Sequence, residues 1–367
     1  MVLAAACGGQ ASWAADISIV QVAPLTGVLA STGQQMVLGG KIYFDWINAN
    51  GGIHGAKIKH EVVDDGYKVD ETVRQTKSAL ERPEVLALFG FAGTANIAKL
   101  LADGVLDGGG APLVAPYTGG EVLRSPFNPY IFHVRAGYAD ETEHMVKQVA
   151  TLGMSRIAEM YQNDAFGKAG LAGVEAAVAK RNLKLVVAAP YERNTDQVAD
   201  AVKLIKEADP HAVIMISVNR STAAFAQQYR DAGGGGQLYN ISVVNPDELV
   251  KLAGLKAVHG LGISQVVPYP YMANKPVVRE YQKLLAQYGG GQAINYTSFE
   301  EFLGAKVLVE GLRRAGPNPT RARLVAALSS MSNFDLGGTT VSYSNTNRIG
   351  SRYVEVTVVG SSGKLMR

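Results

Sequence analysis

Cysteine is almost absent from this chain of 367 residues, and the only one is Cys7. A single cysteine can form no intramolecular disulfide and no cysteine-based metal site. The six histidines are scattered along the sequence without the spacing of metal ligands. The sequence therefore excludes a disulfide-stapled scaffold and a zinc module, and it gives no reason to expect a cofactor.

Charge of one sign and long apolar runs are also scarce. The formal net charge is +3, and no run of four or more basic residues occurs. Nucleic acid is therefore not expected as a partner. The longest apolar runs fall well short of a membrane span. Neither the GxGxxG nor the GxSxG motif is present, which makes an α/β enzyme such as a dehydrogenase the weaker alternative.

The chain does contain enough apolar residues to form the cores of two globular units. Hydrophobic residues make up 47% and charged residues 18%, and there are 41 glycines. This composition is typical of a folded globular protein, and the length suits two lobes better than one core.

The first fifteen residues are interpreted as the remnant of an export signal. Residues 2–7 are apolar, and small residues such as Ala14 suit cleavage near Ala14 or Ala15. Two alternatives remain open: lipid attachment at Cys7, or an unstructured cytoplasmic terminus. The signal interpretation predicts a periplasmic protein.

Apolar strand patterns alternate with helical patterns along most of the chain. This alternation predicts doubly wound, parallel α/β sheets, which bind ligands at the carboxyl ends of their strands. Three late helical patterns have no strands of their own, and we expect them to pack back onto the first lobe. The predicted strands are 17–22, 57–63, 85–89 and 112–115 in a first unit, and 156–160, 184–189, 212–216 and 238–243 in a second, with a closing strand at 352–359.

Two short turns contain the groups that could bind a ligand. The strand 85–89 ends in Gly90-Phe-Ala-Gly93, and a helical pattern begins at Thr94. Free N–H groups, the helix dipole and a hydroxyl donor together favour a carboxylate there. A similar turn, Ala115-Pro-Tyr-Thr-Gly119, follows the next strand. We expect the two turns to form one face of a small-molecule cleft, although Thr94 could instead be a helix cap and Thr118 a turn residue.

An ordered set of motifs carries a family resemblance. Together they resemble the leucine/isoleucine/valine-binding family of periplasmic receptors, which feed ABC importers. The motifs are Ala23-Pro-Leu-Thr-Gly27, residues 48–53, Asp64-Asp65, the two turns above, Phe132-His-Val-Arg135, Asp164-Ala-Phe-Gly167 and residues 298–316.

The resemblance implies a type I periplasmic binding protein: two Rossmann-like α/β lobes joined by three chain crossings, with the ligand held between them. The crossings would lie near residues 134–137, 264–268 and 336–341. The first lobe would then be 16–135 plus 266–338, and the second 136–265 plus 339–367.

The resemblance also implies the site. In this family the first turn binds the ligand carboxylate, the second adds a hydroxyl and backbone groups, and an aromatic residue covers the ligand from the second lobe. Phe166 could instead be a core residue and Asn219 a helix cap. Gln34 and Tyr138 are further candidates for the cleft wall. The residues assigned to ligand binding are Gly93, Thr94, Ala115, Tyr117, Thr118, Phe166, Asn219 and Thr32.

One departure from the family bears on the ligand. Amino-acid binders of the family place a carboxylate for the ligand's ammonium after the strand that matches residues 238–241, where this chain has Ser242-Val243. A buried ammonium without a counter-charge costs several kcal/mol. An aromatic or apolar carboxylate, or an amide, therefore fits. Asp164 could replace the missing acid, so a branched-chain amino acid stays open.

The resemblance implies a receptor and not an enzyme. Its partners would be a small carboxylate or amide and the permease subunits of an importer, and we expect a monomer. A ligand-sensing regulator of the same fold is the alternative, although no DNA-binding segment is present. Asp64-Asp65 could be taken for a metal or acid–base pair. Adjacent strand residues point to opposite faces, so we expect a structural role.

Overall fold

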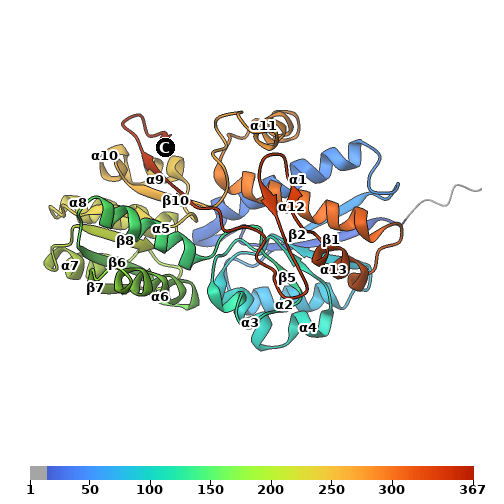
Figure 1. The fold of residues 1–367 in the computed structure, drawn as a ribbon, viewed down its shortest axis with the longest axis horizontal. Helices are drawn as coiled ribbons and strands as arrows, with labels where there is room; N and C mark the ends of the chain where they lie inside the picture. Colours follow the sequence, from blue (N-terminus) through green and yellow to red (C-terminus); the bar gives the residue numbers. More distant parts are fainter. Residues whose placement is uncertain (1–14) are drawn as a thin grey trace, which may run out of the picture.

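The computed structural model describes residues 15–367, which form two α/β lobes lying side by side (Figure 1). The predicted fold class is confirmed. The export signal and the lipid site at Cys7 fall almost wholly on residues 1–14 and so lie outside the described residues. Among residues 15–367, no helix combines the length and apolar character needed to cross a membrane.

The first lobe is built on a parallel sheet in the order β2-β1-β3-β4-β5. Its strands lie where apolar residues recur, and four of the five residues of β3 are buried. The bounds are β1 (Ile17–Ala23), β2 (Ile58–Asp64), β3 (Val85–Phe89), β4 (Leu113–Val114) and β5 (Ile131–Phe132).

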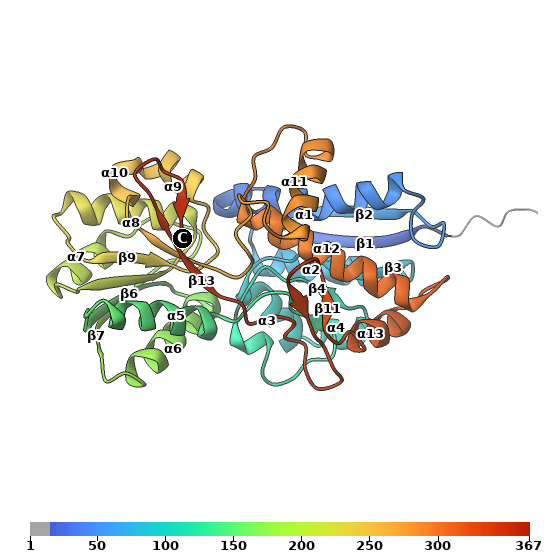
Figure 2. The same ribbon diagram turned by 45° about the horizontal axis from the view of Figure 1, so that its top comes forward.

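Helices from both ends of the chain cover this sheet, as Figure 2 shows for the blue and orange segments. The first long helix begins at Ala30. A Cβ on Gly33 would lie 2.0 Å from the Pro24 carbonyl oxygen, so glycine allows the loop after β1 to touch this first turn. The helix predicted to begin at Thr94 ends at Ala102, and a second helix follows Gly104, which has a φ of 64°. The early helices are α1 (Ala30–Ala49), α2 (Val69–Leu80), α3 (Thr94–Ala102) and α4 (Val105–Gly109), with 3-10 turns η1 (Gly27–Leu29) and η2 (Glu121–Leu123).

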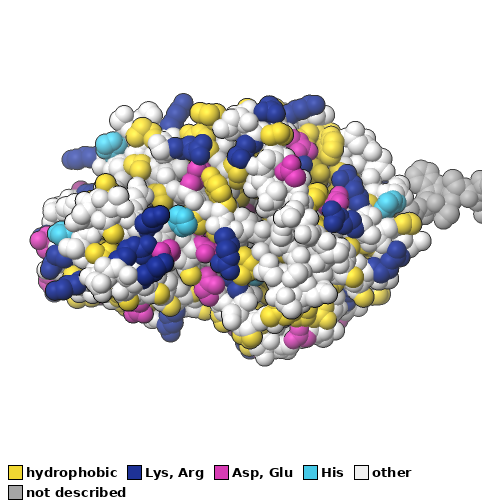
Figure 3. All heavy atoms as spheres, viewed as in Figure 1, with side chains coloured by type: hydrophobic (Ala, Val, Ile, Leu, Met, Phe, Trp, Pro, Cys, Tyr) yellow, Lys and Arg dark blue, Asp and Glu magenta, His cyan; other side chains and the backbone are white. Residues whose placement is uncertain are grey.

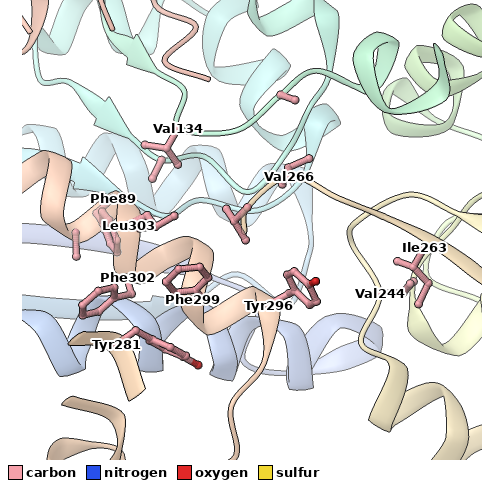
Figure 4. Close-up of a cluster of buried hydrophobic side chains, with 14 of the residues drawn as sticks. Phe89, Val134, Val244, Ile263, Val266, Tyr281, Tyr296, Phe299, Phe302 and Leu303 are labelled. Atoms are coloured by element: carbon pink, nitrogen blue, oxygen red, sulfur yellow. The ribbon is translucent and has the colours of Figure 1, made fainter. Parts of the chain in front are cut away.

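The three late helices pack on the first lobe, as the sequence predicts. They are α11 (Pro276–Tyr288), α12 (Tyr296–Ala315) and α13 (Arg321–Ser329). Helix α12 is buried along most of its length and lies against α1. Phe299 and Phe302 of α12 face Tyr281 of α11, with ring centroids 5.0 and 5.5 Å from it (Figure 4).

The second lobe has a seven-stranded sheet in the order β14-β13-β10-β9-β8-β6-β7. The last two strands in sequence join it antiparallel, and the others are parallel. Its strands are β6 (Arg156–Gln162), β7 (Lys184–Tyr191), β8 (Ala212–Ile216), β9 (Gln237–Asn240), β10 (Gly262–Gln265), β13 (Glu355–Val359) and β14 (Leu365–Met366); its helices are α5 (Tyr138–Thr151), α6 (Ala165–Ala179), α7 (Ala199–Glu207), α8 (Asn219–Asp231), α9 (Pro246–Ala253) and α10 (Leu255–Val258).

The chain passes between the lobes after β5, after β10 and before β13. The first two passages agree with the predicted crossings, but the third lies later than residues 336–341. After the hairpin of β11 (Phe334–Asp335) and β12 (Thr340–Val341), the chain stays on the first lobe. There the His133 N–H donates to the Arg348 carbonyl at 2.9 Å, and the Gly350 N–H donates to the His133 carbonyl at 2.8 Å. These bonds hold the chain on the first lobe as far as Gly350, so the crossing comes later in the sequence. The sequence pattern did not predict them.

The facing sides of the two lobes share one buried apolar cluster. Leu29, Met36 and Tyr67 belong to its first-lobe side, and Val218 and Val243 to its second-lobe side. Outside, side chains of both signs are interspersed over the face drawn in Figure 3. The interlobe surface therefore contains a buried apolar cluster.

Candidate ligand-binding cleft

The first predicted turn ends in a helix cap made by glycine. Gly93 is the N-cap of α3, with a φ of 95°, and no side chain caps this helix. A Cβ at Gly93 would lie 2.5 Å from Asn96 Oδ1 and 2.7 Å from Tyr67 Cε2. Glycine is required here by both the backbone conformation and the close packing. The alternative that Thr94 serves as the cap is wrong.

The hydroxyl of Thr94 joins the two turns. Thr94 Oγ1 lies 2.7 Å from Thr118 Oγ1, and both side chains are fully buried. Thr118 Oγ1 also accepts hydrogen bonds from the Gly120 N–H and the Tyr138 hydroxyl, each at 3.2 Å. A hydroxyl has two lone pairs and one proton, so Thr118 must donate its own proton to Thr94. The proton of Thr94 is then free to bond another acceptor.

Ala115 takes part through its backbone only. It adopts a φ of 55°, and its N–H donates to the Phe132 carbonyl at 2.9 Å. A Cβ on Gly304 would lie 2.3 Å from the Ala115 Cβ, so this methyl faces α12. Ala115 thus shapes the second turn and directs its side chain into the first lobe.

An aromatic wall from the second lobe faces the two turns. The rings of Tyr138 and Phe166 pack edge to face, with centroids 5.5 Å apart. Both side chains are buried, and burial raises the pKa of Tyr138, so it stays a neutral donor. Phe166 lies in the first turn of α6, which Asp164 caps by accepting from the Phe166 and Gly167 N–H groups at 2.9 and 3.2 Å.

Tyr117 links the second turn to the loop at Ser242 in the second lobe. Its hydroxyl lies 3.1 Å from Thr297 Oγ1 and 3.4 Å from the Ser242 carbonyl oxygen, to which it donates. Burial raises the pKa of Tyr117. The side chain of Tyr117 therefore connects the first lobe to the loop that begins at Ser242.

Thr32 and Asn219 meet each other at the interface. Asn219 Nδ2 donates to Thr32 Oγ1 at 3.3 Å and to Glu248 Oε2 at 2.8 Å. Asn219 is the first residue of α8, after the N-cap Val218, so the helix-cap alternative is wrong here too. The pair joins the lobes through polar contacts, and it is not hydrogen-bonded to the Thr94–Thr118 pair.

Arg135 is a buried cation at the first crossing, and no role for it was predicted from the sequence. Its Nη2 lies 3.0 Å from Glu141 Oε1 in the second lobe, and its Nη1 lies 3.3 Å from Glu300 Oε1 in the first. Nη2 also donates to Ser242 Oγ. Burial by itself lowers the pKa of Arg135, but Glu300 and Glu141 more than offset this and raise it.

The acids around Arg135 interact with further groups. Glu141 Oε2 accepts from the Ser242 N–H at 2.8 Å and from Ser264 Oγ at 2.6 Å. Burial raises the pKa of Glu300 to about 7, although the Arg135 charge opposes the shift. Ser242, at the departure from the family pattern, thus lies within an ion network.

Tyr67 and Arg193 form a second unforeseen interlobe contact. The Arg193 guanidinium carbon lies 3.7 Å from the centroid of the Tyr67 ring, and Nη1 lies 2.5 Å from Asp164 Oδ2. Tyr67 is buried with a φ of 61° and accepts from Gln162 at its hydroxyl. No local pattern marks either residue, because they come from loops of different lobes.

The pair Asp64-Asp65 is structural, as expected. Asp64 Oδ1 accepts from the Leu25 and Gly66 N–H groups at 2.8 Å each, and Asp65 accepts from Thr72. Burial by itself raises the pKa of Asp64, but hydrogen bonds from Thr26, Gly66 and Leu25 lower it. Within residues 15–367, no cluster of three or more His, Cys, Asp or Glu residues could hold a metal.

The two lobes enclose a buried polar and aromatic interface, which is compatible with a solute-binding protein. Residues 16–364 match the family described as periplasmic binding protein, and the chain belongs to this family. The resemblance found in the sequence is confirmed.

Individual relatives agree with this assignment. A substrate-binding periplasmic protein from Ralstonia solanacearum is 38% identical, covers 96% of this chain and 99% of its own, and superposes with a TM-score of 0.91. The "Leu/Ile/Val-binding protein homolog 8" of Brucella abortus (strain 2308) is 23% identical over 86% of this chain and 81% of its own. A Thermus thermophilus branched-chain amino acid ABC transporter structure with bound valine shares the fold, with 18% identity, a TM-score of 0.85 and coverage of 96% of this chain and 94% of its own.

Proposed function

We propose that this protein is an exported receptor that binds a small carboxylate with an apolar or aromatic body and delivers it to an ABC importer. The carboxylate would bind at Gly93, Thr94 and Thr118, and Tyr117, Tyr138 and Phe166 would enclose the body. Thr32 and Asn219 would close the interface beside it.

The buried Thr94–Thr118 hydroxyl pair, 2.7 Å apart, is the observation that carries the proposal. The Thr94 hydroxyl accepts from Thr118 and is left to donate at the amino end of α3, where backbone N–H groups and the helix dipole favour an anion. Each charge-assisted hydrogen bond to a buried carboxylate contributes about 1.5–3 kcal/mol. The aromatic pair opposite supplies apolar contact area.

Asp164 and Glu141 already have hydrogen-bond and ion-pair partners, which favours a ligand without an ammonium group. Asp164, the one alternative acid from the sequence, accepts two backbone N–H groups at Oδ1 and pairs with Gln162 and Arg193 at Oδ2. Glu141 is likewise paired with Arg135 and two further donors. Either acid would have to give up existing partners to bind an ammonium.

Matched ligand pairs test this proposal. Thermal unfolding and calorimetric titration would compare leucine with 4-methylpentanoate, and phenylalanine with 3-phenylpropanoate, each pair differing only in the α-amino group. We expect the deaminated acid of at least one pair to raise the melting temperature more, since a ligand that binds only the folded state stabilises it. 3-Phenylpropanamide tests whether a neutral amide replaces the carboxylate.

Opposite results would overturn specific parts of the proposal. A larger shift with leucine or phenylalanine would show that an ammonium is accommodated, as in the valine-bound relative. Chemical conversion of the bound acid, followed by mass spectrometry, would show an enzyme. Uptake of the labelled acid in cells with and without this protein tests delivery to an importer.

A further inference from the structure

Arg193 makes contacts in both lobes. It follows β7 in the second lobe, and its side chain is 15% exposed. Within its own lobe, Nη1 pairs with Asp164 Oδ2 at 2.5 Å. Towards the first lobe, Nη2 donates to the Tyr67 carbonyl and to Asn96 Oδ1, both at 2.7 Å. The guanidinium also stacks on the Tyr67 ring at 3.7 Å.

The two sets of contacts respond differently to opening of the lobes. The Asp164 pair lies within one lobe and survives opening. The bonds to Tyr67 and Asn96 cross the interface and exist only when the lobes are together. Arginine suits this position because its planar guanidinium can donate to a carboxylate and to two further oxygen acceptors at the same time, whereas the lysine ammonium is a point charge.

Asp164 connects Arg193 to the aromatic wall. The carboxylate that pairs with Arg193 is the N-cap of α6, and it holds the N–H of Phe166 itself. Asn96 and Tyr67, on the other side, pack against Gly93, the glycine before Thr94. Arg193 thus connects the residues that support Phe166 to the residues that pack against Gly93. It does not itself line the proposed binding site.

We propose that Arg193 is a positioning residue that couples closure of the lobes to the placement of Phe166 over the cleft. The coupling is a property of the protein alone, but its purpose in binding rests on the proposed function. Because Arg193 interacts with the first lobe only in the closed conformation, it shifts the equilibrium towards that conformation.

The test measures closure in protein without any added ligand. Spin labels would be attached at Lys77→Cys on α2 and Lys203→Cys on α7, in a Cys7→Ser background, and the distance distribution between the lobes would be recorded by pulsed dipolar spectroscopy. We expect Arg193→Ala to raise the open-to-closed ratio roughly tenfold or more, since two charge-assisted bonds are lost. Arg193→Lys should restore part of the closed population.

Arg181→Ala is the matched control. Arg181 forms a comparable ion pair with Glu143 at 2.6 Å, but both residues belong to the second lobe. This variant should leave the interlobe distance unchanged. An unchanged distribution in Arg193→Ala, or an equal shift in Arg181→Ala, would overturn the proposal.

A second readout follows Phe166 directly. In protein labelled with 4-fluorophenylalanine, the fluorine resonance that disappears in Phe166→Leu belongs to Phe166. It should shift or broaden in Arg193→Ala and stay in place in Arg181→Ala. An unmoved resonance would refute the coupling even if closure changed. Neither measurement depends on which ligand binds, so failure here is distinguishable from failure of the proposed function.

Discussion

Thr94 and Thr118 hold the two cleft turns together through hydroxyl oxygens 2.7 Å apart, although the residues are 24 positions apart in the chain. Each hydroxyl follows a strand of the same parallel sheet, and adjacent parallel strands end at one edge. The order of the strands in the sheet therefore brings the two hydroxyls together. A substitution at this pair tests the proposed binding site most directly.

Thr94→Val keeps the shape of the side chain and removes the hydroxyl. We expect carboxylate affinity to fall by roughly 10- to 100-fold, because one charge-assisted hydrogen bond is lost. Calorimetric titration with the best-binding acid of the matched pairs measures this. Thr151→Val, an exposed helix position whose hydroxyl bonds only the Lys147 carbonyl, serves as the control. Equal affinities for Thr94→Val and wild type would remove Thr94 from the site.

Gly93→Ala tests the packing of the first turn. Alanine must adopt a φ of 95° and approach Asn96 and Tyr67 too closely, so we expect a loss of stability above about 1 kcal/mol together with weaker binding. Gly104→Ala is a suitable comparison, because Gly104 has a φ of 64° with open space around it. Chemical denaturation of both variants separates backbone strain from steric conflict. Equal losses would mean that the contacts with Asn96 and Tyr67 are unimportant.

Arg135→Met should destabilise the protein strongly, by about 3–5 kcal/mol, because it leaves Glu141 and Glu300 buried near each other without their cation. Adding Glu300→Gln to this variant should recover part of the loss. A double-mutant cycle measured by denaturant unfolding gives the coupling. Strictly additive effects would show that the two side chains do not interact.

Glu159 should make stability depend on pH. This carboxyl lies in β6 and has no hydrogen-bond partner among residues 15–367, and burial raises its pKa well above the ordinary value of 4.5. The folded state then holds its proton more tightly than the unfolded chain. The stabilisation is complete below about pH 4.5 and is lost as the pH rises through the folded-state pKa.

Glu159→Gln is expected to raise the melting temperature at pH 8 and to flatten this pH dependence. Thermal scans between pH 5 and pH 8 would measure it, with Glu175→Gln as the control, because Glu175 is exposed and contributes only a secondary charge effect. A parallel pH profile in wild type and Glu159→Gln would contradict the prediction.

Local patterns were sufficient to predict the cleft turns. Gly93 and Thr94 stand out because a buried strand, a glycine and a helix start lie within ten positions of one another along the chain. Phe166 followed from a family motif in the same way. Local structure that depends on one turn or one strand end can be predicted from neighbouring residues, whereas the ligand-binding roles assigned to these residues stay predictions.

Contacts made by distant segments could not be predicted. Arg193 reaches Tyr67 across 126 positions, and Arg135 reaches Ser242 across 107. No spacing rule connects loops that meet only after both lobes have formed. The third crossing was misplaced for the same reason, since it depends on bonds between His133 and residues near 350.

The return of α12 to the first lobe has a consequence for the order of folding. The sheet of that lobe is complete by Phe132, yet the helix that lies against α1 begins only at Tyr296. During synthesis the apolar side chains that face α12 stay uncovered until most of the chain has been made, whereas strands β6 to β9 already have their sheet neighbours by then. The first lobe is therefore started first but completed only late, and the second lobe in turn requires β13 and β14 from the end of the chain. Long-range contacts of this kind slow folding.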